Sequence, residues 1–364
     1  MAQLPKERNT WRRLVRNKGA IAGITIIIAA VIIAFMGYII APDNSINANR
    51  MLVEVGGQKP GFKMDFLKLP TQREQQRPGW LNRKLFGDRD PYDYTPLAGY
   101  TETRDSLVIM QYIDEGVAER KAFSLASLQT ADGQKGYEIS RIRFHLGTDK
   151  YGRDILSRLL IGVRVSLGVG LITVIISLSI GVFLGAVAGY YRGWVDEVVM
   201  WFINVIWSIP TLLLVFAITL VLGKGFWQIF IAIGLTMWVS VARIIRGQVL
   251  SVREMEYVEA ARALGFSNAR IITRHILPNV MGPVIVVAAS NFASAIVIEA
   301  GLSFLGVGVQ PPQPSWGLMI KENYNFIITN NPMLALAPGI AIMLLVLAFN
   351  LLGNGLRDAL QVKD

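Results

Sequence analysis

The side chains that most often perform covalent catalysis or bind metals are scarce in this sequence. The chain of 364 residues contains no cysteine and only two histidines, His145 and His275. Neither an HExxH zinc motif nor a GxxxxGK[ST] phosphate-binding loop occurs. Ser303 in "GLSFLG" lacks the second glycine of a nucleophile elbow. We therefore predict that the protein is not an enzyme, has no catalytic residues, and binds neither a metal nor a cofactor of its own.

Six charged side chains lie in one segment between two apolar stretches. This segment, "EMEYVEAARALGFSNARIITRHILPN", combines acidic, basic and apolar residues at helical spacing. Ser251 followed three residues later by Glu254 is a capping-box pattern, which predicts a helix start. Gly265 predicts the end of this helix, because glycine adopts a left-handed backbone at little cost.

A second short helix is predicted after Gly265. Ser267 can cap a helix over Asn268–His275, and Pro278 limits how far that helix continues. The pair of helices has two interpretations on physical grounds alone. It lies in the lipid headgroups or beneath the membrane-spanning helices as an amphipathic element, or it docks onto a cytoplasmic partner.

A second charged motif, "GTDKYGRDILSR", precedes a long apolar stretch. It contains Asp149, Arg153, Asp154 and Arg158, and Thr148 or Asp149 is expected to cap the following helix. Charges at such a position are usually solvated or face lipid headgroups. The alternative is that they hold a gate at the outer face.

Single residues within the apolar stretches also suggest functional sites. Glu299 is a carboxylate inside a predicted membrane span, where an unpaired charge costs about 2.5–3.5 kcal/mol. It either bonds to a neighbouring helix or lines a passage. Pro210 predicts a kink, with or without a gating role. A ridge of small residues, able to pack within the chain or against a second subunit, is formed by Gly181, Gly185 and Gly189.

Membrane-spanning helices are required to position these side chains. Hydrophobic residues make up 52% of the chain and charged residues 17%, against about 25% charged in soluble domains. The net charge of +10 is not gathered in a basic domain with interleaved aromatic residues, so no nucleic-acid partner is expected. Six stretches are long enough to cross a bilayer. They are Gly19–Ala41, Ser166–Tyr190, Val198–Gly223, Phe226–Ala242, Val284–Val309 and Met333–Leu352.

The basic residues predict which ends of these spans face the cytoplasm. If the N-terminus is inside, only Lys224 and Lys321 lie in the short outer connections. Cytoplasmic connections carry an excess of Lys and Arg, so we predict that both termini are cytoplasmic. The basic residues assigned to the inside are Lys6, Arg8, Arg12, Arg13, Arg16, Lys18, Arg243, Arg246, Arg253, Arg262, Arg270 and Arg274.

This topology divides the chain into regions. We predict a basic cytoplasmic arm over 1–18, a first transmembrane anchor over 19–41 and an outer insert over 42–145. A five-helix core follows over 146–364, with a cytoplasmic loop at 243–283. The insert is too long for a structureless connector. The pieces "MLVEV", "DSLVIMQYI" and "YEISRIRFHL" read as short strands, so the insert is expected to be β-rich or mixed.

The charged segment resembles the EAA loop of bacterial ABC-transporter permeases, although His275 stands at a usually apolar position. "LGTDKYGRDILSRLLIGVRVSL", "IEAGLSFLGVGVQPPQPSWG" and "LAPGIAIMLLVLAFNLLGNGLRDAL" resemble the C-type permease subunit of dipeptide and oligopeptide (peptide/nickel) importers. The resemblance is close over 146–360 and loose over 19–41, and the outer insert is longer than usual in the family. The residues that match the EAA spacing are Glu259, Ala260, Ala261, Gly265, Leu277 and Pro278.

The resemblance implies an all-α polytopic membrane protein of the type I ABC importer permease kind, with six transmembrane helices in the bacterial inner membrane. It implies a sister permease, two cytoplasmic ATPases that bind ATP and Mg, an external solute-binding protein and a lipid environment. The EAA loop is then a coupling helix in a groove of an ATPase, and the expected substrate is a peptide. The alternatives are an ATPase-independent secondary transporter or channel and, as a third class, a membrane enzyme using Ser303 or His145.

Overall fold

The structure is a computed structural model that places most of the chain. Lys224, which the sequence assigns to an outer connection, lies outside the described residues, as do the first five residues of the predicted basic arm. The structure describes residues 6–71, 79–129, 135–223, 225–328 and 331–360.

The chain forms two compact units, and each is described here by itself. The division falls within three long helices, because their residues contribute to both units. Unit 1 comprises Met1–Val31, Arg164–Gln310 and Ala341–Asp364, and unit 2 comprises Ile32–Val163 and Pro311–Ile340.

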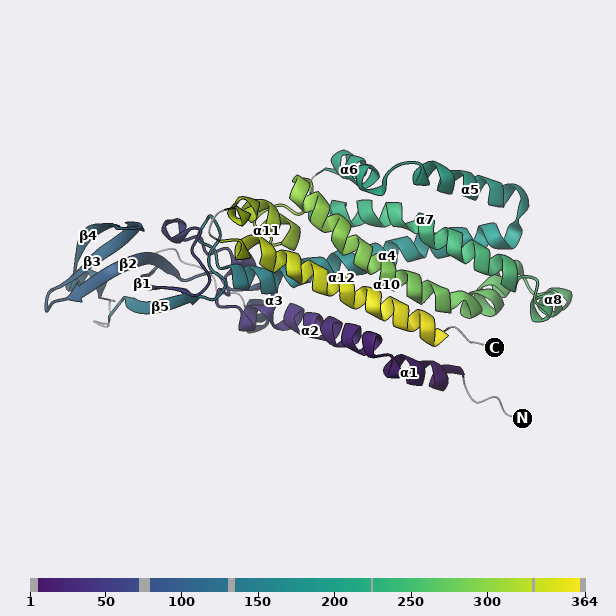
Figure 1. Cartoon of the computed structure of the whole chain (residues 1–364), viewed down its shortest axis with the longest axis horizontal. Helices are drawn as coiled ribbons and strands as arrows, with labels where there is room; N and C mark the ends of the chain where they lie inside the picture. Colours follow the sequence, from purple (N-terminus) through teal and green to yellow (C-terminus); the bar gives the residue numbers. More distant parts are fainter. Residues whose placement is uncertain (1–5, 72–78, 130–134, 224, 329–330, 361–364) are drawn as a thin grey trace. The chain divides into compact units, whose positions relative to one another are not determined.

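Long apolar helices dominate the chain (Figure 1). Five helical stretches among the described residues are long and apolar enough to cross a membrane, or six if one bent pair counts as a span. The prediction of a polytopic helical membrane protein is therefore confirmed. The five stretches contain α2 (Lys18–Ile40), α4 (Ile155–Tyr191), α7 (Phe226–Val252), α10 (Leu277–Leu305) and α12 (Met333–Leu360).

The third predicted span differs from expectation. In place of one kinked helix, the chain forms α5 (Gly193–Trp207) and α6 (Thr211–Leu222), which are bent by 93° relative to each other. Pro210 stands immediately before α6. Proline has no N–H to continue the ladder and disfavours a helical conformation in the residue before it, so the helix ends there and restarts.

The shorter helices lie at the ends of the long ones. In Figure 1, α1, α8 and the end of α12 lie at the same end of unit 1. The predicted loop at 243–283 is mostly helical, since it holds the end of α7, two short helices and the start of α10. The short helices are α1 (Lys6–Arg16), α3 (Trp80–Phe86), α8 (Glu256–Ala263), α9 (Asn268–Ile271) and α11 (Trp316–Asn323).

Unit 2 contains an antiparallel sheet with strand order β4-β3-β2-β1-β5 (Figure 1). Strand β1 pairs with β2 and β5, so that Phe66 lies opposite Pro96 on one side and Ser140 on the other. Alternate residues point to opposite faces, and each face has its own apolar cluster, one around Phe66 and one around Leu67. The strands are β1 (Phe62–Pro70), β2 (Tyr92–Glu102), β3 (Ser106–Asp114), β4 (Val117–Ser124) and β5 (Glu138–Phe144).

The strand predictions for the insert are partly right. The pieces at 105–113 and 137–146 coincide with β3 and β5. The prediction for "MLVEV" is wrong, because Val53–Val55 forms a turn of 3-10 helix. Val55 from this turn is buried beside Phe66 and Phe144, so its apolar side chain reflects packing against the sheet and not membership of it.

Candidate functional site

Helix α8 is a separate two-turn helix between α7 and α9. Its N-cap is Met255, and Ser251 lies inside α7, so the predicted capping box is wrong. The C-terminal end is as expected: Gly265 has a φ of 76°. The N–H of Gly265 donates to the Arg262 carbonyl at 3.0 Å, and the N–H of Phe266 donates to the Ala261 carbonyl at 3.2 Å. This pair of bonds is a Schellman motif, which fixes the turn out of the helix.

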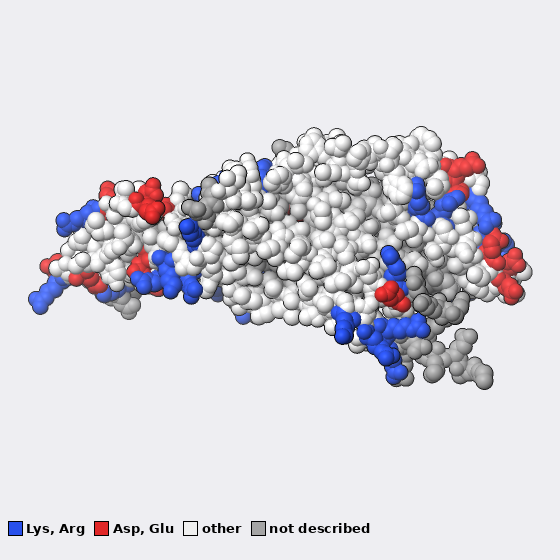
Figure 2. Space-filling view, viewed as in Figure 1, with Lys and Arg blue, Asp and Glu red and all other residues white. Residues whose placement is uncertain are grey.

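The two faces of α8 differ in chemistry. Val258 and Ala261 face inward and join a buried apolar cluster that also contains Ile271 and Ile276. The opposite face carries small and acidic residues in the open. Figure 2 shows acidic groups gathered at this end of unit 1. The exposed residues of this acidic–alanine face are Glu256, Glu259, Ala260 and Ala263.

Of the residues matched to the EAA spacing, only some face outward. Glu259, Ala260, Gly265 and Pro278 are exposed. Ala261 is buried, and Leu277 is partly buried beside the same cluster. The first group is able to touch a partner, whereas the second anchors α8 to the long helices.

The helix after α8 does not stop near Pro278, which corrects the sequence prediction. The segment Ile272–Ile276 is a π-helical turn that leads from α9 directly into α10. The Leu277 N–H donates to the Ile272 carbonyl, five residues back. Pro278 follows with no N–H to donate, so this wider turn lets the chain pass the proline without breaking.

Polar contacts from the end of α4 hold both ends of α8. We call these residues, Tyr190, Arg192, Arg253, Glu254 and Asn268, the α8 junction. The Tyr190 hydroxyl donates to the Asn268 side-chain oxygen at 2.8 Å, and Arg253 donates to the Tyr190 carbonyl. Arg192 forms an ion pair with Glu254 in which both side chains are exposed, at 44% and 58%.

Helix α5 is attached to α7 by a further row of polar contacts. Arg246 on α7 donates two hydrogen bonds to the Asp196 carboxylate on α5. One turn away, Arg243 donates to the Asn204 side-chain oxygen at 3.1 Å and lies 3.5 Å from the centre of the Trp207 ring. These contacts run along α5 up to the break before Pro210.

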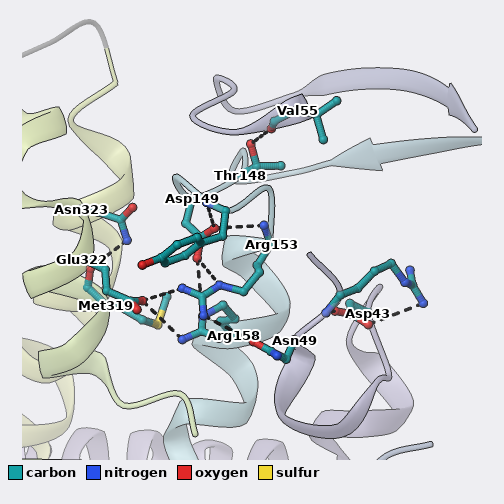
Figure 3. A network of polar contacts seen from close by, with 12 residues as sticks. Asp43, Asn49, Val55, Thr148, Asp149, Arg153, Arg158, Met319, Glu322 and Asn323 are labelled. Carbon is teal, nitrogen blue, oxygen red and sulfur yellow. Dashed lines mark hydrogen bonds and ion pairs between the residues drawn. The ribbon is translucent and has the colours of Figure 1, made fainter. Parts of the chain in front are cut away.

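A second polar cluster lies in unit 2, where the β5–α4 connection meets α11 (Figure 3). Arg153 donates from Nε to Asp149 and from Nη2 to Glu322, both at 2.6 Å. Arg158 lies 3.9 Å from Asp149 and 3.6 Å from Glu322. We call these four residues the Arg153 cluster. Asp149, Arg153 and Arg158 are at most 1% exposed, so the interpretation of these charges as solvated is wrong.

Asp154 caps α4 in place of Thr148 or Asp149. Its Oδ2 accepts the Ser157 N–H at 2.8 Å, the third residue of the helix. Thr148 instead donates to the Val55 carbonyl, and Asp149 accepts from the backbone N–H groups of Tyr151 and Arg153. Burial raises the pKa of Asp154 above its ordinary value, although the hydrogen bonds from Ser157 act in the opposite direction.

The remaining predicted residues lie apart from these clusters. Buried Glu299 on α10 accepts a 2.6 Å hydrogen bond from Ser303, whose Oγ in turn accepts the Val309 N–H at 3.0 Å. These two hydrogen bonds tie the end of α10 to the loop after it, which favours the structural interpretation of Glu299.

The glycine ridge of α4 meets α7. A Cβ added at Gly181 would lie 2.5 Å from the Val241 Cβ, and one at Gly185 would lie 2.5 Å from the Ala242 carbonyl oxygen. A Cβ at Gly189 would come within 2.8 Å of the Arg246 carbonyl oxygen. The two helices approach this closely because the glycines of the ridge have no side chains to separate them.

Sequence reasoning did not identify several partners of these sites. Glu322 lies 169 residues from Arg153, and Asp196 lies 50 residues from Arg246. No local pattern joins such pairs. Arg153 and Arg246 also lie outside the predicted apolar stretches, so the rule that a charge within a membrane span needs a partner did not point to them.

Comparisons with known proteins identify the family. The model of the N-terminal TM domain of oligopeptide transport permease C matches residues 8–53. The glutathione transport system permease protein GsiD of Pectobacterium atrosepticum is 41% identical over 248 residues, which cover 66% of this chain and 82% of that protein. The oligopeptide transport system permease protein OppC of Bacillus subtilis is 37% identical over 257 residues, covering 71% and 82%. The dipeptide transport system permease protein DppC of Alkalihalophilus pseudofirmus is 44% identical over 217 residues, covering 60% and 71%.

Among solved structures, an inward-facing MetNI methionine ABC transporter aligns with a TM-score of 0.47 and 18% identity, over 56% of this chain and 97% of that one. The family model named binding-protein-dependent transport system inner membrane component matches residues 181–363, half of the chain. Its members are multi-pass transport components and not catalysts. This chain therefore belongs to the family of inner membrane components of binding-protein-dependent transport systems.

Proposed function

We propose that this chain is a permease subunit of an ATP-driven importer and that α8 couples it to cytoplasmic ATPases. The observation that carries the proposal is the combination of an exposed acidic–alanine face on α8 with firm anchorage of the same helix. Glu259 and Ala260 are open to a partner, while Val258 and Ala261 are buried in the helical core. A helix held in this way moves as a rigid body when a partner pushes it.

The contacts around α8 supply a route into the membrane. The α8 junction links α8 to the end of α4, next to the start of α5. The row formed by Arg246 with Asp196, and by Arg243 with Asn204, then links α5 to α7. Displacement of α8 is therefore carried to the break at Pro210, where α6 turns away. This is where we expect access to switch.

The partners follow from this role. We propose a heterodimer with a sister permease, two cytoplasmic ATPase subunits that hold ATP and Mg, and an external solute-binding protein. The sequence has no phosphate-binding loop of the GxxxxGK[ST] type, so the nucleotide has to be bound by other subunits. In this arrangement the bent pair α5–α6 counts as one of six spans, both termini are cytoplasmic and the sheet of unit 2 is external.

Peptides are the proposed substrate. The three relatives described above are named for glutathione, dipeptides and oligopeptides, and glutathione is itself a tripeptide. A peptide importer is the function that these names share.

Gentle extraction from the native membrane tests the assembly. The tagged chain is solubilised, and the proteins that accompany it are identified by mass spectrometry. We expect an ATPase with a phosphate-binding loop and a second polytopic permease. Glu259→Lys should remove the ATPase and keep the sister permease, because it reverses a charge on the exposed face of α8 only.

Glu197→Lys is the matched control, since Glu197 is exposed on α5 and lies outside α8. It should retain both partners. A chain that is recovered alone and still moves peptide in liposomes would contradict the proposal and establish an ATPase-independent transporter.

A further inference from the structure

Helix α1 carries an apolar stripe that the protein covers only in part. Leu14 is 5% exposed and packs with Ala20 and Ala359. Trp11 and Val15, one turn apart, continue this stripe and are 64% and 45% exposed. A tryptophan and a valine left open beside an anchored leucine indicate that α1 has a second contact on this side.

Next to the apolar stripe runs a basic one. Arg12 and Arg16 are one turn apart and exposed, and Lys18 follows at the start of α2. Figure 2 shows Lys and Arg groups gathered at the end of unit 1 that carries α1. The exposed surface of α1 is therefore apolar along one stripe and cationic along the neighbouring one.

The position of α1 along the chain places this surface at the membrane boundary. Asn17 alone separates α1 from α2, and its side-chain oxygen accepts the Ala20 N–H at 3.1 Å, which caps the anchor helix. Helical rise brings Arg12 within about 10 Å of Gly19, where the apolar stretch begins. The headgroup layer is roughly 5–8 Å thick on each side of the hydrocarbon core.

We propose that α1 binds anionic lipid headgroups, with Trp11 and Val15 inserted at the edge of the acyl chains and Arg12 and Arg16 contacting phosphates. Aromatic side chains favour the membrane interface, and arginines near an anionic surface strengthen binding. Free phosphate would engage the arginines but would leave the apolar stripe in water. An anionic lipid satisfies both stripes with one ligand.

The absence of cysteine makes this surface easy to probe. A nitroxide label on Val15→Cys, in the full chain reconstituted into vesicles, reports its own exposure to oxygen and to a water-soluble nickel chelate. In phosphatidylcholine mixed with phosphatidylglycerol, we expect the label to be accessible to oxygen and protected from the nickel chelate. In phosphatidylcholine alone, protection should be lost.

Arg12→Gln combined with Arg16→Gln should lower the ratio of inserted to water-exposed label by about 20-fold at low salt. High salt should reduce the ratio in the unsubstituted chain as well. A label on Val117→Cys, which is 54% exposed on β4, is the control and should stay accessible to the nickel chelate in both vesicles.

Three results would overturn the proposal. One is equal exposure of the Val15 label with and without phosphatidylglycerol. Another is protection in phosphatidylcholine alone on addition of inorganic phosphate, which would point to free anion. The third is protection that appears only after an ATPase subunit is added, which would show that α1 contacts protein.

Discussion

The Arg153 cluster in unit 2 and the α8 junction in unit 1 use the same side-chain chemistry in opposite surroundings. In the cluster, Arg153 is 1% exposed and meets two carboxylates at 2.6 Å. In the junction, Arg192 and Glu254 form a single ion pair in which both side chains are exposed. Water screens the second pair and leaves the first intact, so the two should differ greatly in how readily they break.

This difference indicates different tasks. A buried cluster that joins the β5–α4 connection to α11 has few alternative arrangements, because any separation leaves charges without partners. We infer that it is a fixed brace. The Arg192–Glu254 pair of the α8 junction can exchange its partner for water at little cost, which suits a helix that has to follow another protein.

Breaking the Arg153 cluster should have the largest effect on stability. Arg153→Met removes both 2.6 Å bonds and leaves the buried Asp149 and the partly buried Glu322 with Arg158 alone, at 3.9 and 3.6 Å. We expect a loss of about 3–5 kcal/mol in the free energy of unfolding. Denaturant or thermal unfolding of the purified chain measures it. Arg141→Met is the matched control in the same unit, since Arg141 pairs with Asp65 on the sheet and is 68% exposed. It should cost at most about 1 kcal/mol, and equal losses would show that burial does not distinguish the pairs.

A substitution at the contact between α4 and α7 should have the next largest effect on the free energy of unfolding. Gly185→Ala places a methyl group 2.5 Å from the Ala242 carbonyl oxygen, for an expected loss of about 1–3 kcal/mol. Gly168→Ala on the same helix meets no described heavy atom within 4 Å and should be neutral or slightly stabilising. Thermal unfolding of both variants in one detergent makes the comparison. A destabilised Gly168 variant would implicate a contact outside this chain.

Reversing one charge of the Asp196–Arg246 pair should lower stability by an intermediate amount, and reversing the second charge as well should restore most of it. Arg246 donates two hydrogen bonds to Asp196, and the side chains are 27% and 15% exposed. Asp196→Arg or Arg246→Asp alone should cost about 1–2 kcal/mol and slow uptake, while the double reversal should recover more than half of both losses. Additive losses in the double variant would mean that the pair does not act as a unit.

Glu254→Gln should have the smallest effect on stability. Its ion pair with Arg192 is exposed, so we expect a change below about 1 kcal/mol. A larger loss in unfolding measurements would show that the α8 junction is a brace like the Arg153 cluster, and the contrast between the two would disappear.

The helices were easier to predict than the sheet, for a physical reason. Spans such as α2 and α12 need long apolar stretches, which composition alone reveals. Strand β4 is exposed along most of its length and β2 contains Pro96, so neither shows a buried alternating pattern. The break between α5 and α6 was expected only as a kink, because the sequence does not specify whether a helix resumes its direction after a proline.

For the candidate sites, a local signal was reliable at Gly265 but not at Ser251, and the distant partners had no local signal. Gly265 marked the turn after α8 correctly, since its role depends on its own backbone. The predicted helix cap at Ser251 was wrong because α7 continues through this residue, and packing of α7 overrides a local cap. Burial of Asp149 and Arg153 depends on Glu322 in α11, which local sequence does not connect to them.

The ratio of peptide uptake to ATP hydrolysis, measured in proteoliposomes that contain the extracted complex, decides whether α8 couples an ATPase to transport. Gly265→Pro removes the N–H bond to Arg262 and forbids a φ of 76°, and Ala260→Trp adds bulk to the exposed face of α8 without touching the core. We expect both variants to insert normally, to bind the sister permease and to lose most of the uptake per ATP hydrolysed. Unchanged uptake per ATP in both would contradict this expectation.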